Sequence, residues 1–391
     1  MKQAVANKPC DIVIIGGGLV GFAFLLALPE HLQQRTLVLD SAEQPDGQRP
    51  SPGFDDRGTA LSRRSLELLD QLGVLADLSP DLGALHDIEV SQQGYWGTTR
   101  LTSEEAFGAV VNNRQLGHAL WHRVQQTGAE SRFQQGVERL TPTAEHTQVH
   151  TNDGATLAAR LVVLADGGRS GLAKQLGITQ KHHDYGQTAI VFNLEREKPA
   201  GGRAYERFTS TGPRALLPLA GRRQTVVWTV PTETLAEHLD WDDAAWKAQL
   251  LHCFGHDQGA IAAISARAHY PLHWRQSREQ VRHRLALIGN SALSLHPVAG
   301  QGFNLHLRSL MTLAEALATS NDPGDIRHLQ IWQASNQWDQ QQVALACHGL
   351  VSLFAYPQAA AAHARGLSLS ALDMAPTLKR CLTQYAMGYT Q

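Results

Sequence analysis

The segment from Asp11 to Asp40 constrains the fold of this chain more than any other part of the sequence. It begins with four apolar, mostly β-branched residues, Ile12 to Ile15, which predict a buried parallel strand. The apolar run Leu19–Leu28 predicts a helix, and Thr36–Leu39 predicts a second strand. A strand, a helix and a second strand in this order predict an α/β fold with a Rossmann-like unit at its start.

Three glycines join the first strand to the helix in the spacing G-x-G-x-x-G. Gly16 allows a tight turn, Gly18 lets backbone N–H groups approach a pyrophosphate, and Gly21 lets helix and strand pack closely. Asp40 lies 19 residues (40 − 21) beyond the last glycine and can accept hydrogen bonds from ribose hydroxyls. A glycine-rich turn without a ligand is the alternative, but the strand, helix and terminal Asp together favour a bound adenine dinucleotide.

Two later segments also place glycines directly after a buried strand. Asp166 and Gly167 follow the strand predicted at Leu161–Leu164, and Gly289 follows the strand predicted at Leu285–Ile288. Glycines and polar residues between a buried strand and a helix are typical of a turn that faces a ligand. We therefore expect the turn at Asp166 and Gly167 to face a ligand, as the first turn does.

Hydrophobic periodicity predicts the other elements. The apolar positions from Ala60 to Leu72 predict an amphipathic helix, and Val110–Gln126 predicts another. Alternating residues from Tyr185 to Tyr270 predict an antiparallel sheet that a helix at Trp241–Phe254 interrupts. The chain is expected to end in helices, and the change of pattern at Tyr185 predicts a second domain inserted into the first.

Composition excludes several classes of protein. The chain has 391 residues and a formal net charge of −2, so no basic surface indicates a nucleic-acid partner. Its four cysteines are scattered, which predicts reduced thiols, and no histidine and carboxylate spacing predicts a metal site. Residues 1–9 are polar and predict no signal peptide, and no apolar run is long enough to span a bilayer. We expect a cytoplasmic protein.

Three motifs occur in order along the chain: GGGLVG with Asp40, then ADGGRS, then GN followed by HPVAGQGFNL. This ordered set resembles the class A flavoprotein aromatic hydroxylases, which have the para-hydroxybenzoate hydroxylase fold. Within that group the chain is similar to the ubiquinone-biosynthesis hydroxylases, because it also contains PGFDDRGTAL, GRAYERFTSTGPRALLPL, Asn290 and LVSLFA. The resemblance covers essentially the whole chain.

The resemblance implies FAD as the cofactor and a division into three regions. A discontinuous FAD-binding domain is expected over residues 1–86, 106–184 and 281–340, an antiparallel-sheet substrate domain over 87–105 and 185–280, and a helical region over 341–391.

The FAD-binding positions follow from the family motifs. Gly16, Gly18, Gly21 and Asp40 correspond to residues that hold the ADP part, and Arg57 and Arg114 to residues near the cofactor. The other positions are Asp166, Gly167, Gly289, Asn290, Pro297, Gly300, Gln301, Gly302, Phe303 and Asn304, the last six beside the isoalloxazine. The sequence leaves open whether Arg57 pairs with the pyrophosphate or is a surface arginine.

No catalytic residue can be identified from the sequence. His296 is either the base that acts on the substrate or a structural histidine that binds the backbone, and the second role is favoured. Phe208, Leu216 and Leu217 are expected to line the path of an isoprenoid tail, although such residues ordinarily belong to a core.

Two positions depart from the family motif. His306 replaces a glycine and Ser309 replaces an aspartate, and residues three apart share one face of a helix. A glycine there permits close backbone approach, which an imidazole blocks. We hypothesise that the imidazole turns toward Ser309 and hydrogen-bonds to it, so that the two replacements compensate.

The implied activity is that of an FAD-dependent NAD(P)H:O2 monooxygenase in ubiquinone biosynthesis. It would convert a 2-polyprenyl-6-methoxyphenol to 2-polyprenyl-6-methoxy-1,4-benzoquinol through a C4a-hydroperoxyflavin. With a single G-x-G-x-x-G in the chain, NAD(P)H is expected to bind only transiently. Implied partners are the polyprenylated phenol, O2, a ubiquinone-biosynthesis protein complex and, peripherally, the inner face of the membrane. The alternatives are a flavoenzyme of the same fold that acts at another ring position or reduces a prenyl group, and a non-catalytic subunit of such a complex.

Overall fold

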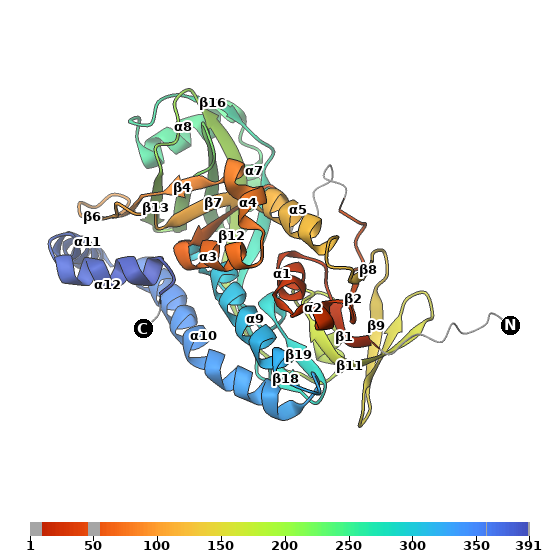
Figure 1. The fold of residues 1–391 in the computed structure, drawn as a ribbon. Helices are drawn as coiled ribbons and strands as arrows, with labels where there is room; N and C mark the ends of the chain where they lie inside the picture. Colours follow the sequence, from red (N-terminus) through yellow and green to blue (C-terminus); the bar gives the residue numbers. More distant parts are fainter. Residues whose placement is uncertain (1–9, 46–54, 357, 390–391) are drawn as a thin grey trace.

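The computed structural model describes residues 10–45, 55–356 and 358–389. Residues 1–9, on which the prediction of no signal peptide rests, lie outside the described residues. The chain forms two large sheets with the long helix α9 (Gln301–Ala318) lying between them, and a helical region follows at the C-terminal end (Figure 1). The protein therefore has the α/β architecture with an antiparallel sheet and a helical C-terminus that the sequence predicts.

The first sheet has eight strands and contains the predicted strand–helix–strand unit. Strand β1 (Cys10–Ile15) pairs in parallel with β2 (Thr36–Leu39) on one side and with β11 (Thr156–Leu164) on the other. Helix α1 (Leu19–Ala27) connects β1 to a short helix, α2 (Glu30–Gln33), which leads into β2. The remaining strands of this sheet are β8 (Glu130–Arg132), β9 (Val137–Pro142), β10 (Thr147–Thr151), β18 (Val281–Arg282) and β19 (Leu285–Leu287).

Both faces of β1 are covered, which explains why its sequence is apolar throughout. Ile12 and Ile14 pack in the core that contains α1 and α9 (Gln301–Ala318), whereas Val13 and Ile15 pack against Val149 and other residues of the β9–β10–β11 region. A strand that is buried on both faces has no position for a polar side chain. The predicted buried parallel strand is confirmed.

The second sheet has nine strands, most of them antiparallel. Its order is β20–β17–β12–β15–β14–β13–β5–β6, and β16 pairs with β12. The strands are β5 (Asp87–Gln92), β6 (Thr98–Thr102), β12 (Gln180–Arg196), β13 (Arg203–Thr209), β14 (Gly212–Pro218), β15 (Arg223–Pro231), β16 (Ile261–Ile264), β17 (Ala268–Ser277) and β20 (Leu293–Ser294). Helix α7 (Leu235–Leu239) and helix α8 (Asp243–Phe254) follow β15, and α8 packs on one face of the sheet. The predicted antiparallel sheet with a helical interruption is confirmed.

A small third sheet corrects two predicted helix starts. It consists of β3 (Gly58–Ser62), β7 (Gly108–Asn112) and β4 (Gly83–Leu85). Helix α3 therefore runs over Arg63–Gln71 rather than from Ala60, and α5 over Asn113–Val124 rather than from Val110. The reason is tertiary, because Ala60 pairs with Val110 across the two strands. The short helices α4 (Leu75–Leu78) and α6 (Leu172–Gln175) complete this part of the chain.

The C-terminal region consists of α10 (Ile326–Ala355), α11 (Ala359–Asp373) and α12 (Pro376–Ala386). Figure 1 shows α10 running beside α9 and reaching from the end of the first sheet toward the second. Among the helices of the described residues, none has the length and hydropathy needed to cross a bilayer. The exact domain boundaries stay a prediction.

Candidate functional site

The glycine turn after β1 has the geometry of a phosphate-binding turn. Gly16 has a φ of +113°, and an added Cβ would lie 2.5 Å from the Ala165 carbonyl oxygen. A Cβ on Gly21 would lie 1.9 Å from the Gly16 oxygen, so both residues must be glycine for the chain to pack. A Cβ on Gly18, in contrast, would meet no atom within 4 Å. Gly18 therefore leaves space for a ligand to approach the backbone.

The start of α1 is open to an anion. Gly18 is the N-cap residue and supplies no side-chain hydrogen bond, so the first N–H groups of this helix have no side-chain cap. Such a terminus combines free donors with the positive end of the helix dipole. The donors suit a pyrophosphate, and the space above Gly18 suits the close approach that it needs.

Asp40 lies at the end of β2, next to this turn. Its Oδ2 accepts a hydrogen bond from the Gly17 N–H at 2.6 Å, and its Oδ1 accepts one from the Ala42 N–H at 2.7 Å. These two bonds fix the carboxylate against the glycine turn. Each oxygen can accept a further hydrogen bond, so the residue retains the capacity to hold ribose hydroxyls.

Asp166 connects the two later turns to each other. Its carboxylate accepts hydrogen bonds from the Gly168 N–H at 2.9 Å, from the Ser170 N–H at 2.8 Å and from the Ser291 hydroxyl at 2.5 Å. Burial raises the pKa of Asp166, but the hydrogen bonds from Ser170, Ser291 and Gly168 outweigh it, and the pKa is lowered. Gly167, at a φ of +69°, makes the sharp turn that permits these contacts. The predicted turns after β11 and β19 therefore meet at one place.

His306 contacts Asn290, and this corrects the predicted contact with Ser309. The imidazole Nε2 lies 3.2 Å from Oδ1 of Asn290, which is itself exposed. The ring also makes a hydrogen bond with the Leu293 backbone, so its partners are Leu293 and Asn290 rather than Ser309. Asn290 follows β19 and His306 belongs to α9. Helix periodicity relates only residues of one helix, so it could not predict this contact.

The His306 side chain is buried and uncharged. Only 7% of the residue is exposed, and burial, assisted by the charge of Arg308, lowers its pKa to about 4. A neutral imidazole has one donor and one acceptor nitrogen, so it selects one orientation of the neighbouring amide. His306 thus fixes which atom of Asn290 faces the predicted FAD site.

The loop before α9 is held to β3 by Asn304. Its side-chain oxygen accepts a hydrogen bond from the Ser62 N–H at 2.9 Å, and its amide nitrogen donates to the carbonyls of Ala60 at 2.9 Å and Gly300 at 3.0 Å. The Asn304 side chain is therefore committed to the protein. Any contact of this loop with a flavin would come from its backbone, and Gly300, at a φ of +60°, turns that backbone into the uncapped N-terminus of α9.

Other predicted loop residues differ in exposure. Pro297 is exposed, Gly302 and Phe303 are half-buried, and Gln301 is buried with its amide donating to the Ala299 carbonyl at 3.2 Å. Ala299 has a φ of +59°, which is unusual for a residue with a Cβ. Strain of this kind is concentrated at functional sites.

The two predicted arginines lie together and are paired with carboxylates. Arg57 Nη2 lies 2.7 Å from Asp55 Oδ2, and its guanidinium lies over the Tyr270 ring at 4.3 Å. Arg114 Nε lies 2.9 Å from Asp56 Oδ1. The proximity of Arg57 to the pyrophosphate and that of Arg114 to the cofactor stay predictions.

His296 has the structural role that the sequence favours. Its Nδ1 accepts a hydrogen bond from the Val298 N–H at 3.2 Å, and only 1% of the residue is exposed. Burial lowers its pKa to about 4, so the ring is neutral. The bond to the backbone is confirmed, and the ring shapes the loop that precedes α9.

The predicted apolar lining is wrong for Leu216. Phe208 lies on the sheet face toward α10, where its ring stacks on Phe354 at 3.8 Å between centroids. Leu216 packs on the opposite face, in the core with Trp228 and α8. Leu217 follows Leu216 in the strand, so its side chain is on the same face of the sheet as Phe208.

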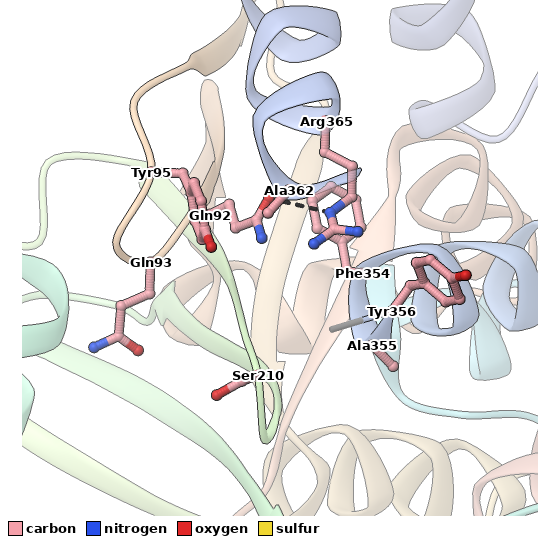
Figure 2. Close-up of a pocket in the computed structure, with 9 residues that line it drawn as sticks. All are labelled: Gln92, Gln93, Tyr95, Ser210, Phe354, Ala355, Tyr356, Ala362 and Arg365. Carbon is pink, nitrogen blue, oxygen red and sulfur yellow. Dashed lines mark hydrogen bonds between the residues drawn. The ribbon is translucent and has the colours of Figure 1, made fainter. Parts of the chain in front are cut away.

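A cavity of about 270 Å³ lies beyond Phe354, between α10, α11 and the edge of the second sheet (Figure 2). Most of its nine lining residues carry polar groups: Gln92, Gln93, Tyr95, Ser210, Tyr356 and Arg365. Figure 2 shows Arg365 bonded to Gln92, and Arg365 Nη1 also donates to the Leu353 carbonyl at 3.0 Å, near the end of α10. Arg365 therefore has a structural role, and a polar cavity of this kind does not suit an isoprenoid tail.

The sequence analysis missed one acidic residue on the sheet face toward α10. Glu206 is on β13, between Ala204 and Phe208 on the same face of the sheet. A carboxylate at an inward position of an alternating strand is the signal that could have identified it. In the described part of the chain, no group of three or more histidine, cysteine or acidic residues is placed to hold a metal ion.

Comparisons with known proteins agree with this geometry. A family described as FAD binding domain matches residues 9–325. The ubiquinone hydroxylase UbiL of Rhodospirillum rubrum is 33% identical over 98% of this chain and 90% of its own length. The 3-demethoxyubiquinol 3-hydroxylase of Escherichia coli is 27% identical over 98% of this chain and 100% of its own. Among solved structures, Pseudomonas aeruginosa PqsL in complex with 2-aminobenzoylacetate has a TM-score of 0.78 at 20% identity, covering 92% of this chain and 100% of its own.

Proposed function

The chain belongs to the FAD binding domain family and is an FAD-dependent monooxygenase, and on this premise we propose that it hydroxylates the ring of a polyprenylated phenol in ubiquinone biosynthesis. The proposed substrate is a 2-polyprenyl-6-methoxyphenol and the product is the corresponding 1,4-benzoquinol. The observation that carries this proposal is similarity along almost the whole chain to hydroxylases named for ubiquinone.

The proposed FAD contacts follow the three turns. The Gly16–Gly21 turn and the start of α1 would hold the pyrophosphate, and Asp40 the ribose. Asn290 and Asp166 would lie along the ribityl chain, and the loop that ends at Gly300 would lie beside the isoalloxazine. Bound FAD supplies the electron transfer from NAD(P)H and the activation of O2 that this chain's own side chains cannot perform.

The chain contributes positioning, electrostatics and exclusion of water. The uncapped N-terminus of α9 presents positive partial charge, which stabilises negative charge on a neighbouring group. His296 is neutral, so the loop beside it adds no competing charge. The stacked rings of Phe208 and Phe354 form an apolar wall that keeps water from the reacting ring.

We also propose that the protein contacts the inner face of the membrane peripherally. The outer face of α10 exposes Ile331, Trp338 and Leu345 at 66%, 67% and 73%. These residues recur every seven positions and so lie near one line along the helix. Flotation with liposomes, compared for the native chain and an Ile331→Gln, Trp338→Gln, Leu345→Gln variant, tests this contact. Equal flotation of both proteins would contradict it.

The substrate proposal is tested with purified holoprotein and NAD(P)H. We expect NAD(P)H oxidation to accelerate on addition of a short-chain 2-prenyl-6-methoxyphenol, with formation of the 1,4-benzoquinol seen by mass spectrometry and NMR. Because the relatives include a hydroxylase named for another ring position, the product's substitution pattern is the decisive readout. Hydroxylation at a different carbon would refute the substrate assignment and leave the enzyme class intact.

A further inference from the structure

We infer that Glu206 is a catalytic residue: its carboxylate accepts the hydroxyl proton of the phenol substrate. Glu206 is on the sheet face that is turned toward the loop preceding α9, so the substrate would bind between the two. This assignment rests on the proposed function, because it gives that function the base which the sequence leaves unidentified. His296 does not serve as this base, because its Nδ1 accepts from the Val298 N–H and the neutral ring therefore carries its proton on Nε2, which can only donate.

The sheet register places Glu206 on the face toward the predicted flavin. Glu206 lies between Val90 of β5 and Ala215 of β14 in the sheet. Val90 and Phe208, on the same face, belong to one apolar cluster with Val298 from the loop and Leu305 from α9. Tyr205 and Arg207 alternate to the other side, where Arg207 donates to the Cys253 carbonyl of α8.

Helix α10 also contacts the loop on this side of the sheet. Cys347 of α10 contacts the Val298 carbonyl, with its sulfur 3.8 Å from that oxygen. Burial, with the neighbouring Glu206 charge as the next cause, raises the pKa of the Cys347 thiol to about 12. Phe208, which shares the Glu206 face of β13, belongs to one cluster with Cys347 and Val298, so Glu206 is on the side of the sheet that faces the loop.

Glu206 has no structural explanation within the described residues. Among them it makes no ion pair or hydrogen bond, although it is half-buried and its partners in the sheet, Val90 and Ala215, are apolar. A carboxylate in apolar surroundings is costly unless a partner compensates it, and a buried polar group without one requires an explanation. A phenol hydroxyl is a partner of the right chemistry.

Buried donors on the same cluster indicate a ligand that carries oxygen atoms. Within the described residues, Trp274 Nε1, Tyr385 Oη and His296 Nε2 are buried without a hydrogen-bond partner. Trp274 and Tyr385 pack against the cluster that contains Val298, and the His296 ring contacts Tyr185 of that cluster at 5.0 Å between centroids. A methoxyphenol brings both the hydroxyl that a base needs and oxygen atoms that can accept from such donors.

The proton transfer balances with the reaction of the enzyme class. The phenol O–H bond breaks, its proton moves to Glu206, and its electron pair enters the ring and makes a ring carbon nucleophilic. A C–O bond forms at that carbon with one atom of O2, and the carbon loses its own proton to water. The O–O bond breaks and the other oxygen atom leaves as water, with NAD(P)H supplying two electrons and solvent the protons. The electron pair of the broken C–H bond restores the aromatic ring, and the original phenol oxygen takes back the proton from Glu206.

Near neutral pH, Glu206 is expected to change its charge while the titratable groups of the neighbouring cluster do not. Burial raises the pKa of Glu206 to about 8, and it raises the pKa of Tyr185 to about 12 and that of Tyr385 to about 12. With Cys347 also protonated and His296 neutral, these groups keep one charge state between about pH 6 and pH 9. Two exposed histidines, His183 and His348, contact the Tyr185 ring. Both are present in every variant compared below, so they cannot cause a difference between the variants.

The test compares Glu206→Gln with the native holoenzyme and with Glu89→Gln. Glu89 is on the adjacent strand, paired with Tyr205 in register, and its carboxylate lies 3.8 Å from Arg203 on the other face. We expect Glu206→Gln to lower the rate of hydroxylation by about 100-fold or more near neutral pH, as loss of a general base does. FAD affinity should stay unchanged, and Glu89→Gln should behave as the native enzyme in every assay.

The pH profile separates a base from a structural carboxylate. In the native enzyme kcat/KM should rise through about pH 8, and Glu206→Gln should lose this limb and regain rate only as the phenol itself ionises near about pH 10. A fluorinated phenol that ionises near neutral pH should show a much smaller loss. If Glu206→Gln retains the native rate and profile, the assignment is overturned.

Two further outcomes are distinguishable. If Glu206→Gln does not fold, Glu206→Asp keeps a base, and its pH limb must persist at reduced rate for the assignment to stand. If the native holoenzyme hydroxylates no phenol at any pH, the proposed function fails, whatever the variants do. If the native enzyme is active and the losses in Glu206→Gln are equal at every pH and for every phenol, the residue is structural and the assignment fails alone.

Discussion

Replacing His306 by alanine should weaken FAD binding only while Asn290 is present. His306 Nε2 lies 3.2 Å from Asn290 Oδ1. The imidazole is buried, and burial keeps it neutral. Its role is then to orient the Asn290 amide, and Asn290 would hold the cofactor. A residue that acts through another loses its effect when that residue is removed.

The magnitude follows from one hydrogen bond between uncharged groups. Such a bond contributes about 0.5–1.5 kcal/mol net. This corresponds to roughly a two- to twelvefold change in the dissociation constant. We therefore expect His306→Ala to weaken FAD binding about two- to twelvefold, Asn290→Ala to weaken it by at least as much, and the double variant to equal Asn290→Ala.

The assay is fluorescence titration of the purified apoprotein with FAD for all four members of the cycle. Urea unfolding of each protein separates a loss of affinity from a loss of stability, because removing the buried imidazole leaves a cavity. Ser309→Ala is the matched control on the same helix face and should leave the affinity unchanged. Two results would refute the reasoning: equal weakening by His306→Ala in both backgrounds, or tighter FAD binding when the imidazole is removed, which would mean that it obstructs the cofactor.

Three other predictions test the remainder of the site. Asp40→Ala should weaken FAD binding at least tenfold, since two hydrogen bonds to a charged carboxylate contribute about 1.5–3 kcal/mol each, and an unchanged dissociation constant from equilibrium dialysis would disprove the ribose contact. Asn304→Ala should lower the free energy of unfolding by about 2–4 kcal/mol, because it leaves the Ser62 N–H and the Ala60 carbonyl without their partner; an unchanged urea midpoint would contradict this. Acid should destabilise the protein below about pH 6.5, because the unfolded chain binds protons at His296 and His306 between their ordinary pKa and the folded value of about 4. Each histidine should contribute about 3 kcal/mol, lost as the pH falls through that window, and Gln variants at both positions should flatten the thermal stability measured against pH.

The sequence predicted the nucleotide end of the site, because all of its residues belong to one continuous segment. The strand, the glycine turn, the helix and Asp40 belong to one continuous segment, and each glycine has a requirement that can be stated from spacing alone. The structure adds that Gly18 differs from Gly16 and Gly21, because only Gly18 leaves open space. The nucleotide end of the site was therefore accessible to sequence reasoning.

Contacts between distant segments could not be predicted in this way. Ala60 and Leu61 have the periodicity of a helix, but their pairing with Val110 and Ala109 of β7 makes them a strand. The partner of His306 is on another element, so the helix face suggested Ser309 instead of Asn290. Both errors come from tertiary contacts that override a local pattern.

Other errors could have been avoided from the sequence. Successive residues of a strand point to opposite faces, so Leu216 and Leu217 cannot line one path. The same alternation places Glu206 on the face of Phe208, where a carboxylate is out of place in a core. Strand periodicity, applied strictly to β13 and β14, would have identified both.

The central claim is that this chain inserts one oxygen atom from O2 into a polyprenylated phenol. Its most direct test is turnover of the purified, FAD-loaded protein with NAD(P)H and a short-chain 2-prenyl-6-methoxyphenol under ¹⁸O2, followed by mass spectrometry of the product. We predict a benzoquinol that carries one ¹⁸O atom, with one NAD(P)H oxidised for each product formed. Oxidation of NAD(P)H with hydrogen peroxide as the only oxygen-containing product, or a product labelled from H2¹⁸O rather than from ¹⁸O2, would contradict the claim.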